Sequence, residues 1–217
     1  MFVDHLGVFV FPDQPFFRLV GRLSFPLFAW AIANGAYHTR NINKYLLRIF
    51  LMAVISQIPY QLIFRTSGVP SPGLNILFTF SLSLLAIILL NKTKKSFIKL
   101  LIVVFAALLA LVLKTDYQAF GVFSVIVFYL FYNKPLFLGI AYFLLTNVFF
   151  LFPLFVNKFL GSVFEVSYIN VFELVSITSV FIIALYNNKK GKDIRLLFYV
   201  FYPLHLLLLY LFKLFVF

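Results

Sequence analysis

Residues 196–217 read LLFYVFYPLHLLLLYLFKLFVF, a run in which only His205 and Lys213 can carry a charge near neutral pH. About 20 apolar residues are enough for an α-helix to cross the hydrocarbon core of a bilayer. Because backbone groups inside lipid must be hydrogen-bonded within the protein, such a run predicts a transmembrane helix. His205 follows Arg195 by ten residues, which places it near the bilayer midplane at about 1.5 Å per residue. This stretch therefore predicts both a membrane fold and a buried polar group.

The whole chain has the same character. Of its 217 residues, 64% are hydrophobic and 11% are charged, whereas soluble domains have about 45–50% apolar and about 25% charged residues. Charges, prolines and glycines divide the sequence into nine apolar segments. These segments are Met1–Phe11, Phe17–Tyr37, Tyr45–Phe64, Leu74–Leu90, Phe97–Leu113, Ala119–Tyr132, Leu136–Phe155, Tyr168–Tyr186 and Leu196–Phe217. We expect an all-α, polytopic bundle of eight to nine membrane helices, the first too short to span, forming one integral-membrane domain over residues 1–217.

The distribution of basic residues predicts the orientation. The net charge is +12, and in a multi-pass membrane protein an excess of Lys and Arg marks the cytoplasmic loops. Alternate connections carry 12 basic residues on one side: Arg40, Lys44, Arg48, Lys92, Lys94, Lys95, Lys99, Lys134, Lys189, Lys190, Lys192 and Arg195. The other side carries 6: Arg18, Arg22, Arg65, Lys114, Lys158 and Lys213. We therefore expect a bacterial inner-membrane protein with its N-terminus in the cytoplasm.

Composition also argues against several functions. The chain has no cysteine, so disulfides and thiol chemistry are excluded. Its three histidines are far apart in sequence, and we expect no metal site. It has no basic-aromatic nucleic-acid motif, and the positive charge is better explained by cytoplasmic loops next to lipid. The start of the sequence has neither a basic n-region nor a small-residue cleavage site, so we expect no cleavable signal.

The first segment contains Asp4 and His5 within an apolar run. An ionisable residue in a membrane segment costs roughly 2.5–3.5 kcal/mol on insertion scales and is by default a functional hypothesis. The structural alternative is that His5 hydrogen-bonds a neighbouring helix and Asp4 pairs with an arginine. His205 has the same two interpretations. Histidines from the first and the last helix can face one cavity, but the sequence does not determine that they do.

Four more polar residues lie in or beside the apolar segments. Arg22 precedes Pro26 by one turn, and Pro26 leaves the Arg22 carbonyl without its helical partner, so we expect a kink there. Arg22 either snorkels to the interface or faces the bundle as a ligand for an anion or a carbonyl. Arg48 can likewise snorkel. Asn75 opens its segment as a helix cap or as a ligand. Asp116 can pair with Lys114 or Arg22, or cap the next helix.

The order of short motifs resembles a known family. These motifs are Asp4-His5 with Gly7, Gly21-Arg22 with Phe25-Pro26, His38-Thr39-Arg40-Asn41, Ser56-Gln57-Ile58-Pro59, Leu74-Asn75, Asp116-Tyr117 with Gly121, and Tyr202-Pro203-Leu204-His205. Together they cover nearly the whole chain, which resembles the TraX family, associated with N-terminal acetylation of conjugative pilin. That family in turn resembles the broader integral-membrane acyltransferases, whose first helix has a basic residue, ten positions, then a catalytic histidine. His5 matches the histidine, and the basic residue would fall before Met1.

The resemblance implies acetyl transfer from cytoplasmic acetyl-CoA, with His5 as general base and Asp4 orienting it. Its implied acceptors are a pilin-like protein or an envelope glycan or lipid. Candidate residues for holding the thioester or the CoA phosphates are Arg22, Arg48, Asn75, Asp116, Tyr202 and His205. Glu173 is given no role.

Two other functions stay open. One is a proton-coupled transporter or flippase with Asp4, His5 and His205 as a relay, although the sequence lacks a repeated pair of broken segments. The other is a non-catalytic assembly subunit in which polar residues hold helices together.

Overall fold

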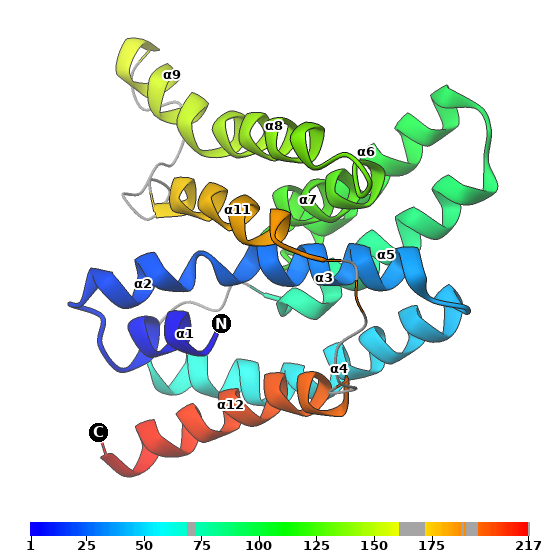
Figure 1. Cartoon of the computed structure of the whole chain (residues 1–217). Coiled ribbons are helices and arrows are strands. Elements are labelled where there is room, and N and C mark those ends of the chain that lie inside the picture. The colour runs from blue at the N-terminus through cyan, green and yellow to red at the C-terminus, as the bar shows by residue number, and fades with distance from the viewer. Residues whose placement is uncertain (69–72, 161–171, 188, 190–194, 217) are drawn as a thin grey trace.

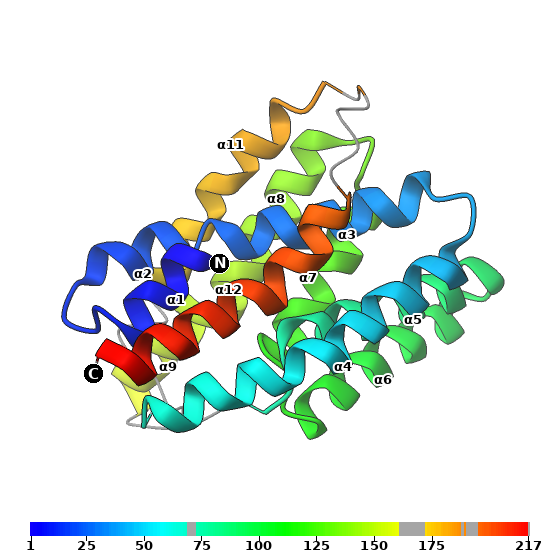
Figure 2. The same cartoon turned by 90° about the horizontal axis from the view of Figure 1, so that it is seen from below.

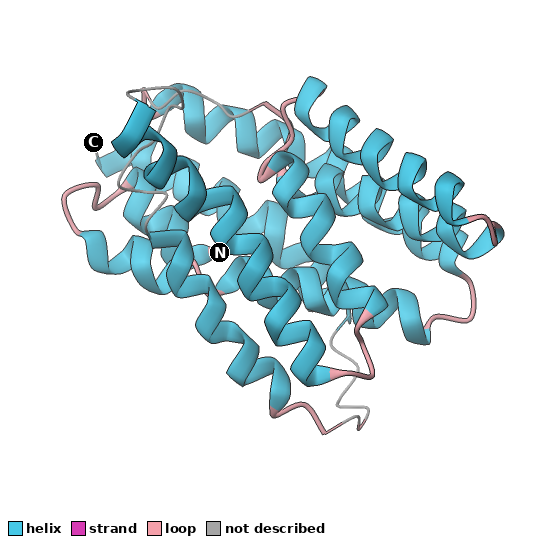
Figure 3. Cartoon of the chain, turned by 90° about the horizontal axis from the view of Figure 1, so that it is seen from above, coloured by secondary structure: helices cyan, strands magenta, loops and turns pink. Residues whose placement is uncertain are grey.

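The computed structural model describes residues 1–68, 73–160, 172–187, 189 and 195–216, and within these ranges it is built from helices without β-strands (Figure 3). The elements are α1 (Phe2–Phe9), α2 (Pro15–Gly21), α3 (Ser24–His38), α4 (Ile42–Thr66), α5 (Ile76–Lys92), α6 (Ser96–Val112), α7 (Gln118–Leu130), α8 (Pro135–Thr146), the π-helical turn η1 (Asn147–Leu151), α9 (Phe152–Leu160), the 3-10 helix η2 (Glu173–Thr178), α11 (Ser179–Ala184) and α12 (Arg195–Val216). The all-α prediction is confirmed.

The helix boundaries follow the apolar segments to within a few residues, with two exceptions. The segment predicted over residues 17–37 is divided into α2 and α3, and the one predicted to end at Phe155 continues through η1 into α9. The predicted helix start at Tyr168 lies outside the described residues. Part of the predicted link over residues 157–166 and most of the loop predicted over residues 67–73 also lie outside them.

Four helical stretches are long and apolar enough to cross a membrane: Pro15–His38, Ile42–Thr66, Pro135–Phe159 and Leu197–Phe215. The other apolar helices are shorter. The surface is apolar as well, as on α6, where Phe97, Leu100, Phe105 and Leu108 are all exposed. Exposed apolar area on this scale is typical of contact with lipid rather than water. The chain is therefore a helical membrane bundle.

The break between α2 and α3 lies where the sequence predicts a kink. Pro26 has no amide hydrogen to donate to the carbonyl of Arg22, and at residues 22 and 23 the α-helical hydrogen-bond pattern is interrupted while the backbone angles stay helical. The Ser24 hydroxyl donates to the carbonyl of Gly21 over 2.5 Å. A backbone carbonyl at the break is thus hydrogen-bonded inside the bundle, as a membrane interior requires.

The interior of the bundle is built on α5 and α7. α5 has buried residues over most of its circumference, with Leu85 and Leu89 exposed on one face, so most of the helix is enclosed by others. α5 packs against α4 and α7, α7 packs against α3, α6 and α8, and α12 packs against α4 (Figure 1).

One end of the bundle holds the turn between α3 and α4, and we call it the α3–α4 end. There, the Tyr132 hydroxyl donates to Asn34 over 2.7 Å, and the Asn133 amide donates to the Tyr37 hydroxyl over 2.6 Å. Side chains after α7 therefore meet the last turns of α3 at this end.

The opposite end holds the turn between α6 and α7, and we call it the α6–α7 end. Leu74 and Asp116 exchange backbone contacts there, with the Asp116 amide donating to the Leu74 carbonyl over 2.8 Å. Gln57 and Gln61 of α4 both donate to the carbonyl of Gly73 over 2.8 Å. The chain before α5 is thus fixed to α4 and to the start of α7.

Helices from the two termini of the chain lie side by side. α1, α4 and α12 all run from the side of the α3–α4 end towards the α6–α7 end (Figures 1 and 2). α1 contacts both α2 and α12, and Lys213 of α12 donates to the carbonyl of Phe9 at the end of α1 over 3.1 Å. Eight residues are too few for a stable isolated helix, so α1 depends on these contacts.

Two glycines allow α1 to approach α2 closely. A Cβ atom on Gly21 would lie 2.6 Å from Cα of Asp4, and one on Gly7 would lie 2.8 Å from Cβ of Phe17. Separations this short are not tolerated between carbon atoms, and at Gly21 the neighbour is backbone, which cannot rotate away.

Gly21→Ala is therefore expected to push α1 off α2 and to lower the free energy of unfolding by about 1–3 kcal/mol, as overpacking does. Thermal unfolding of the detergent-solubilised protein measures this effect. Gly139→Ala is the matched control, because its Cβ would meet only the end of the Val180 side chain at 3.2 Å. Equal unfolding temperatures for the two variants would contradict the close backbone contact.

Candidate active site

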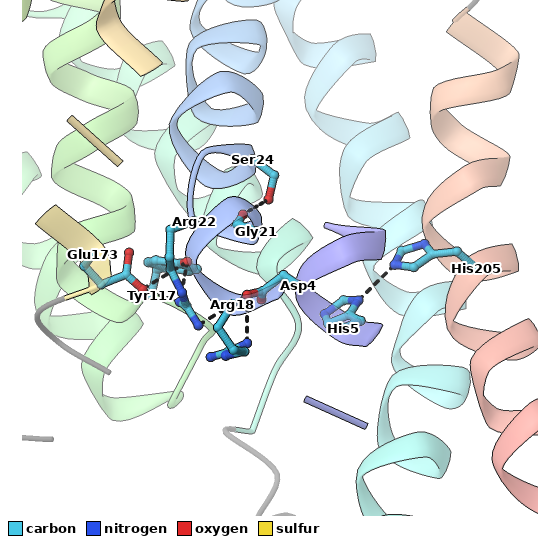
Figure 4. A network of polar contacts seen from close by, with 9 residues as sticks. All are labelled: Asp4, His5, Arg18, Gly21, Arg22, Ser24, Tyr117, Glu173 and His205. Carbon is cyan, nitrogen blue, oxygen red and sulfur yellow. Dashed lines mark hydrogen bonds and ion pairs between the residues drawn. The ribbon is translucent and has the colours of Figure 1, made fainter. Parts of the chain in front are cut away.

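His5 and His205 form a direct pair between the first and the last helix (Figure 4). Nδ1 of His5 lies 3.0 Å from Nε2 of His205. The rings are nearly parallel, with centroids 5.2 Å apart and an interplanar angle of 12°. His205 is buried at 3% exposure, and Phe201 stacks on it with ring centroids 4.9 Å apart. The structure thus brings together two histidines that are 200 residues apart in sequence.

The hydrogen bonds assign the proton positions in the neutral pair. Nδ1 of His205 lies 2.7 Å from the carbonyl oxygen of Phe201, and a carbonyl can only accept, so this nitrogen carries the hydrogen. Nε2 of a neutral His205 is then an acceptor, and His5 must donate to it from Nδ1. Nε2 of His5 is left with its lone pair, and it has no hydrogen-bond partner within the described part of the chain. The pair therefore presents one basic nitrogen, held in a fixed tautomer.

A cavity of about 600 Å³ lies between α3, α4 and α12, and neither histidine of the pair is among its lining residues. Towards the α3–α4 end it is lined by Asn34, Gly35 and Tyr45, and further in by Met52 and Leu77. Its wall on α12 is formed by Phe198, Tyr199, Phe201 and Tyr202, and Met1 also lines it. Tyr202 packs edge-on against His205, with ring centroids 5.4 Å apart. The cavity wall is thus in contact with the buried histidine.

Asp4 points to the other side of α1 from His5 (Figure 4). Its Oδ1 accepts from Nη1 of Arg18 over 2.8 Å and lies 3.5 Å from Nη2 of Arg22. Adjacent residues on a helix point about 100° apart, so one of the two can face α2 while the other faces α12. The structure brings Asp4 to the arginines and not to the imidazole of His5.

Arg22 is buried at 6% exposure and does not snorkel. Its Nη1 donates to Oε1 of Glu173 and, over 2.9 Å, to the hydroxyl of Tyr117. With Asp4 on its other side, the guanidinium lies between two carboxylates (Figure 4). Burial of an unpaired charge is costly, and this arrangement supplies the opposite charges that make it tolerable.

The sequence analysis missed Glu173. The chain has only 6 acidic residues, and Glu173 is 4% exposed. The signal that could have found it is its place in an apolar segment, because acidic residues there are rare and usually have a partner. Which partner it has was not predictable, since Arg22 lies 151 residues away in sequence.

Asn75 is fully occupied by protein groups. Its Oδ1 accepts from the Leu77 amide over 3.0 Å, as expected of a helix N-cap. Its Nδ2 donates to the carbonyl of Ala53 and to Oε1 of Gln57, both over 2.8 Å. The side chain is 0% exposed. Asn75 was interpreted from the sequence as a helix cap or as a ligand, and in the structure it is a helix cap.

Asp116 lies in the turn between α6 and α7, where its carbonyl accepts from the Thr79 hydroxyl over 2.5 Å. Within the described residues its carboxylate forms no ion pair with Lys114 or Arg22. Burial raises the pKa of Asp116 to about 6, and the positive charge of Arg22 opposes that rise.

Of Arg48 and Tyr202, only Tyr202 lines the cavity. Arg48 is exposed near the α3–α4 end, where its Nε donates to the carbonyl of Lys44 over 3.2 Å. It follows Tyr45 and precedes Ile49, which both line the cavity. Tyr202 is 5% exposed and lines the inner part. No group of three metal-ligating side chains occurs in the part of the chain that the structure describes.

The fold and the site together define a helical membrane protein with a partly buried histidine pair near a cavity. Comparison with known proteins gives the family: the chain matches the model described as TraX protein over residues 1–213, and it belongs to the TraX family. It is also 28% identical over 222 residues to the probable fimbrial assembly protein FimC, serogroup H1, of Dichelobacter nodosus, covering 96% of this chain and 89% of that protein. No solved structure matches the chain.

The ion cluster around Arg22 yields a stability prediction. Glu173→Gln leaves a buried guanidinium with one of its two carboxylates, and we expect the free energy of unfolding to fall by about 3–5 kcal/mol. Arg18→Gln is the matched comparison, because the Arg18 and Asp4 side chains are 17% and 18% exposed whereas those of Arg22 and Glu173 are 7% and 5% exposed, so we expect a smaller loss. Both are measured by thermal or denaturant unfolding in detergent.

Combining Arg22→Gln with Glu173→Gln removes both charges of the pair. The loss of unfolding free energy in this double variant should be clearly smaller than the sum of the two single losses, because each single change leaves a charge without its partner in the Arg22–Glu173 pair and the double change removes both charges. Strict additivity in this double-mutant cycle would mean that the two side chains do not interact.

Proposed function

We propose that this protein is a membrane-embedded acetyltransferase that moves an acetyl group from acetyl-CoA to an amine or hydroxyl acceptor. The observation that carries the proposal is the His5–His205 pair, whose only available lone pair is on Nε2 of His5. Proton transfer by a positioned histidine contributes about 10²–10⁴ to the rate of such reactions. Membership of the TraX family, which is associated with pilin acetylation, agrees with this chemistry.

The reaction needs one proton acceptor that later becomes a proton donor. Nε2 of His5 takes the proton from the acceptor amine or hydroxyl as its nitrogen or oxygen attacks the thioester carbonyl carbon. The carbon–sulfur bond then breaks, and the thiolate of CoA takes up the proton from the His5 imidazolium. His205 is a positioning residue here: it accepts from Nδ1 of His5, and the Phe201 carbonyl holds its own ring in the required tautomer.

The cavity suits an acyl donor that arrives from the α3–α4 end. The basic residues nearest its outer part are Arg40, Lys44 and Arg48, all exposed, and we propose that this end faces the cytoplasm of a bacterial inner membrane. The apolar wall would accommodate the uncharged arm of the donor, with the acetyl group near His5 and the phosphates outside. Of the residues considered for donor contacts, we assign this role to Arg48 and Tyr202, because Asn75 and Arg22 are occupied by protein partners.

The acceptor is proposed from the comparisons. The relative from Dichelobacter nodosus is a probable fimbrial assembly protein, which favours a pilin-like protein whose N-terminal amine is acetylated over an envelope glycan or lipid hydroxyl. Peptides with a free and with a blocked N-terminus, offered beside a glycan acceptor, distinguish these substrates.

Transfer of radiolabelled acetyl from acetyl-CoA by the purified full chain tests the function. His5→Ala is expected to lower the rate by about 100-fold or more, because the general base is lost. His38→Ala is the matched control, since this third histidine is exposed and bonds only the carbonyl of Asn34 within the described chain. His205→Gln should retain more activity than His205→Ala, because an amide oxygen can still accept from Nδ1 of His5. Full turnover by His5→Ala would reject the base, and a wild-type protein that transfers no acetyl group would favour a non-catalytic assembly role.

Arg48 provides a test of the direction from which the donor enters. Arg48→Ala is expected to raise the KM for acetyl-CoA by about 3–10-fold, the loss of one exposed charged contact worth about 1 kcal/mol. The KM for S-acetylpantetheine, which lacks the phosphorylated nucleotide, should not change. Lys99→Ala is the control, because Lys99 is an exposed basic residue on α6, which does not line the cavity. An equal change for both donors would contradict phosphate binding at Arg48.

A further inference from the structure

Two buried hydroxyl groups on α4 have no hydrogen-bond partner within the described part of the chain: Oγ of Ser56 and the phenol oxygen of Tyr60. Ser56 is 0% and Tyr60 is 1% exposed. Other buried hydroxyls on helices bond to protein groups, as Ser83 and Ser124 do to carbonyls four residues earlier. Since unpaired buried polar groups cost about 1–3 kcal/mol each, two of them on one helix require an explanation.

Both residues lie beyond the last residue of α4 that lines the cavity, on the same face of the helix. Tyr45, Ile49 and Met52 line the cavity from α4, and Ser56 and Tyr60 follow at the same three- to four-residue spacing. Residues at this spacing share one face of a helix. This face of α4 therefore runs from the α3–α4 end, along the cavity, to the hydroxyls of Ser56 and Tyr60 beyond it.

On α1 and on α12, a histidine likewise follows a cavity-lining residue by one helical turn. Met1 lines the cavity, and His5 lies one turn later, with its amide donating to the Met1 carbonyl over 3.0 Å. Phe201 lines it on α12, and His205 follows by one turn. α1, α4 and α12 run in the same direction (Figures 1 and 2), so one turn beyond the cavity lie His5, His205 and Ser56.

Aromatic contacts fix the level of Tyr60. Phe9 of α1 meets Phe64 of α4 with ring centroids 5.0 Å apart. One turn earlier on each helix are His5 and Tyr60, and each contacts the phenylalanine of its own helix. Side chains on a helix lean towards its N-terminus, which for Tyr60 is the direction of Ser56 and the cavity.

We propose that the hydroxyls of Ser56 and Tyr60 donate hydrogen bonds to the carbonyl oxygen of the acetyl group during transfer. This inference rests on the proposed function. As the acceptor atom bonds to the carbonyl carbon, the π electrons move onto that oxygen, which becomes negative. Two fixed donors in a water-poor site stabilise it, and when the oxygen re-forms its double bond, the carbon–sulfur bond breaks. In the absence of the thioester the donors have nothing to bind, which accounts for their unpaired state.

The test separates this role from a structural one. Tyr60→Phe and Ser56→Ala each remove a hydroxyl that has no hydrogen-bond partner among the described residues, so the unfolding temperature should stay the same or rise. The rate constant kcat should fall by about 100-fold for either variant, with little change in the KM for acetyl-CoA, because the donors act on the transition state. A loss of activity that parallels a loss of folded protein would overturn the proposal.

Matched controls come from hydroxyls that are bonded. Tyr142 lies on α8, and its hydroxyl bonds the hydroxyl of Ser176 over 3.0 Å. Ser124 lies on α7, and its hydroxyl donates to a backbone carbonyl. Tyr142→Phe should lower the unfolding temperature, and both Tyr142→Phe and Ser124→Ala should keep kcat. If the wild type transfers acetyl groups and Tyr60→Phe and Ser56→Ala do so equally fast, the inference fails while the proposed function stands. If the wild type transfers none, the proposed function fails and this inference with it.

Discussion

The contact of α1 with Gly21 is the constraint on which the site depends. α1 has only eight residues and cannot hold its conformation alone. It is placed because Gly21 has no side chain, so that the backbone of Asp4 lies against the end of α2. The break that follows Gly21 comes from Pro26, and it leaves Arg22 beside Asp4. One close backbone approach thereby fixes the position of both ionisable residues of α1.

Asp4 and His5 make contacts on different sides of α1. Asp4 joins an ion cluster with Arg18, Arg22 and Glu173, which connects α1 and α2 to η2. His5 faces α12 and pairs with His205. Because Asp4 and His5 are adjacent, any shift of the ion cluster also moves the imidazole. The cluster therefore helps to position His5 without contacting its imidazole, and precise positioning of side chains is what a functional site requires.

The sequence was a good guide to the local features and a poor one to long-range pairs. Apolar length gave the helices, and Pro26 gave the break between α2 and α3, because both are properties of a few neighbouring residues. The partner of Arg22 was not predictable, since Glu173 and the turn carrying Tyr117 reach it only through the packing of the whole bundle. Sequence suggested that His5 and His205 can share a cavity, but their direct bond depends on α1 and α12 lying side by side. The acetyl transfer assigned to them remains a proposal.

Leaving a buried hydroxyl without a hydrogen-bond partner lowers the stability of the folded protein. In a lipid-embedded protein an unpaired hydroxyl cannot be hydrated from outside, so its cost is not reduced by solvent. Packing an apolar residue at Ser56 or Tyr60 would be the simpler way to stabilise α4, and such substitutions are generally easy to find. The two hydroxyls, which have no partner among the described residues, instead continue the face of α4 that lines the cavity, and the paired histidines follow the cavity's lining residues on α1 and α12 by one turn. A carbonyl group whose carbon is to be attacked and whose oxygen is to become negative matches that arrangement, because it needs donors on the oxygen and a base near the attacking atom.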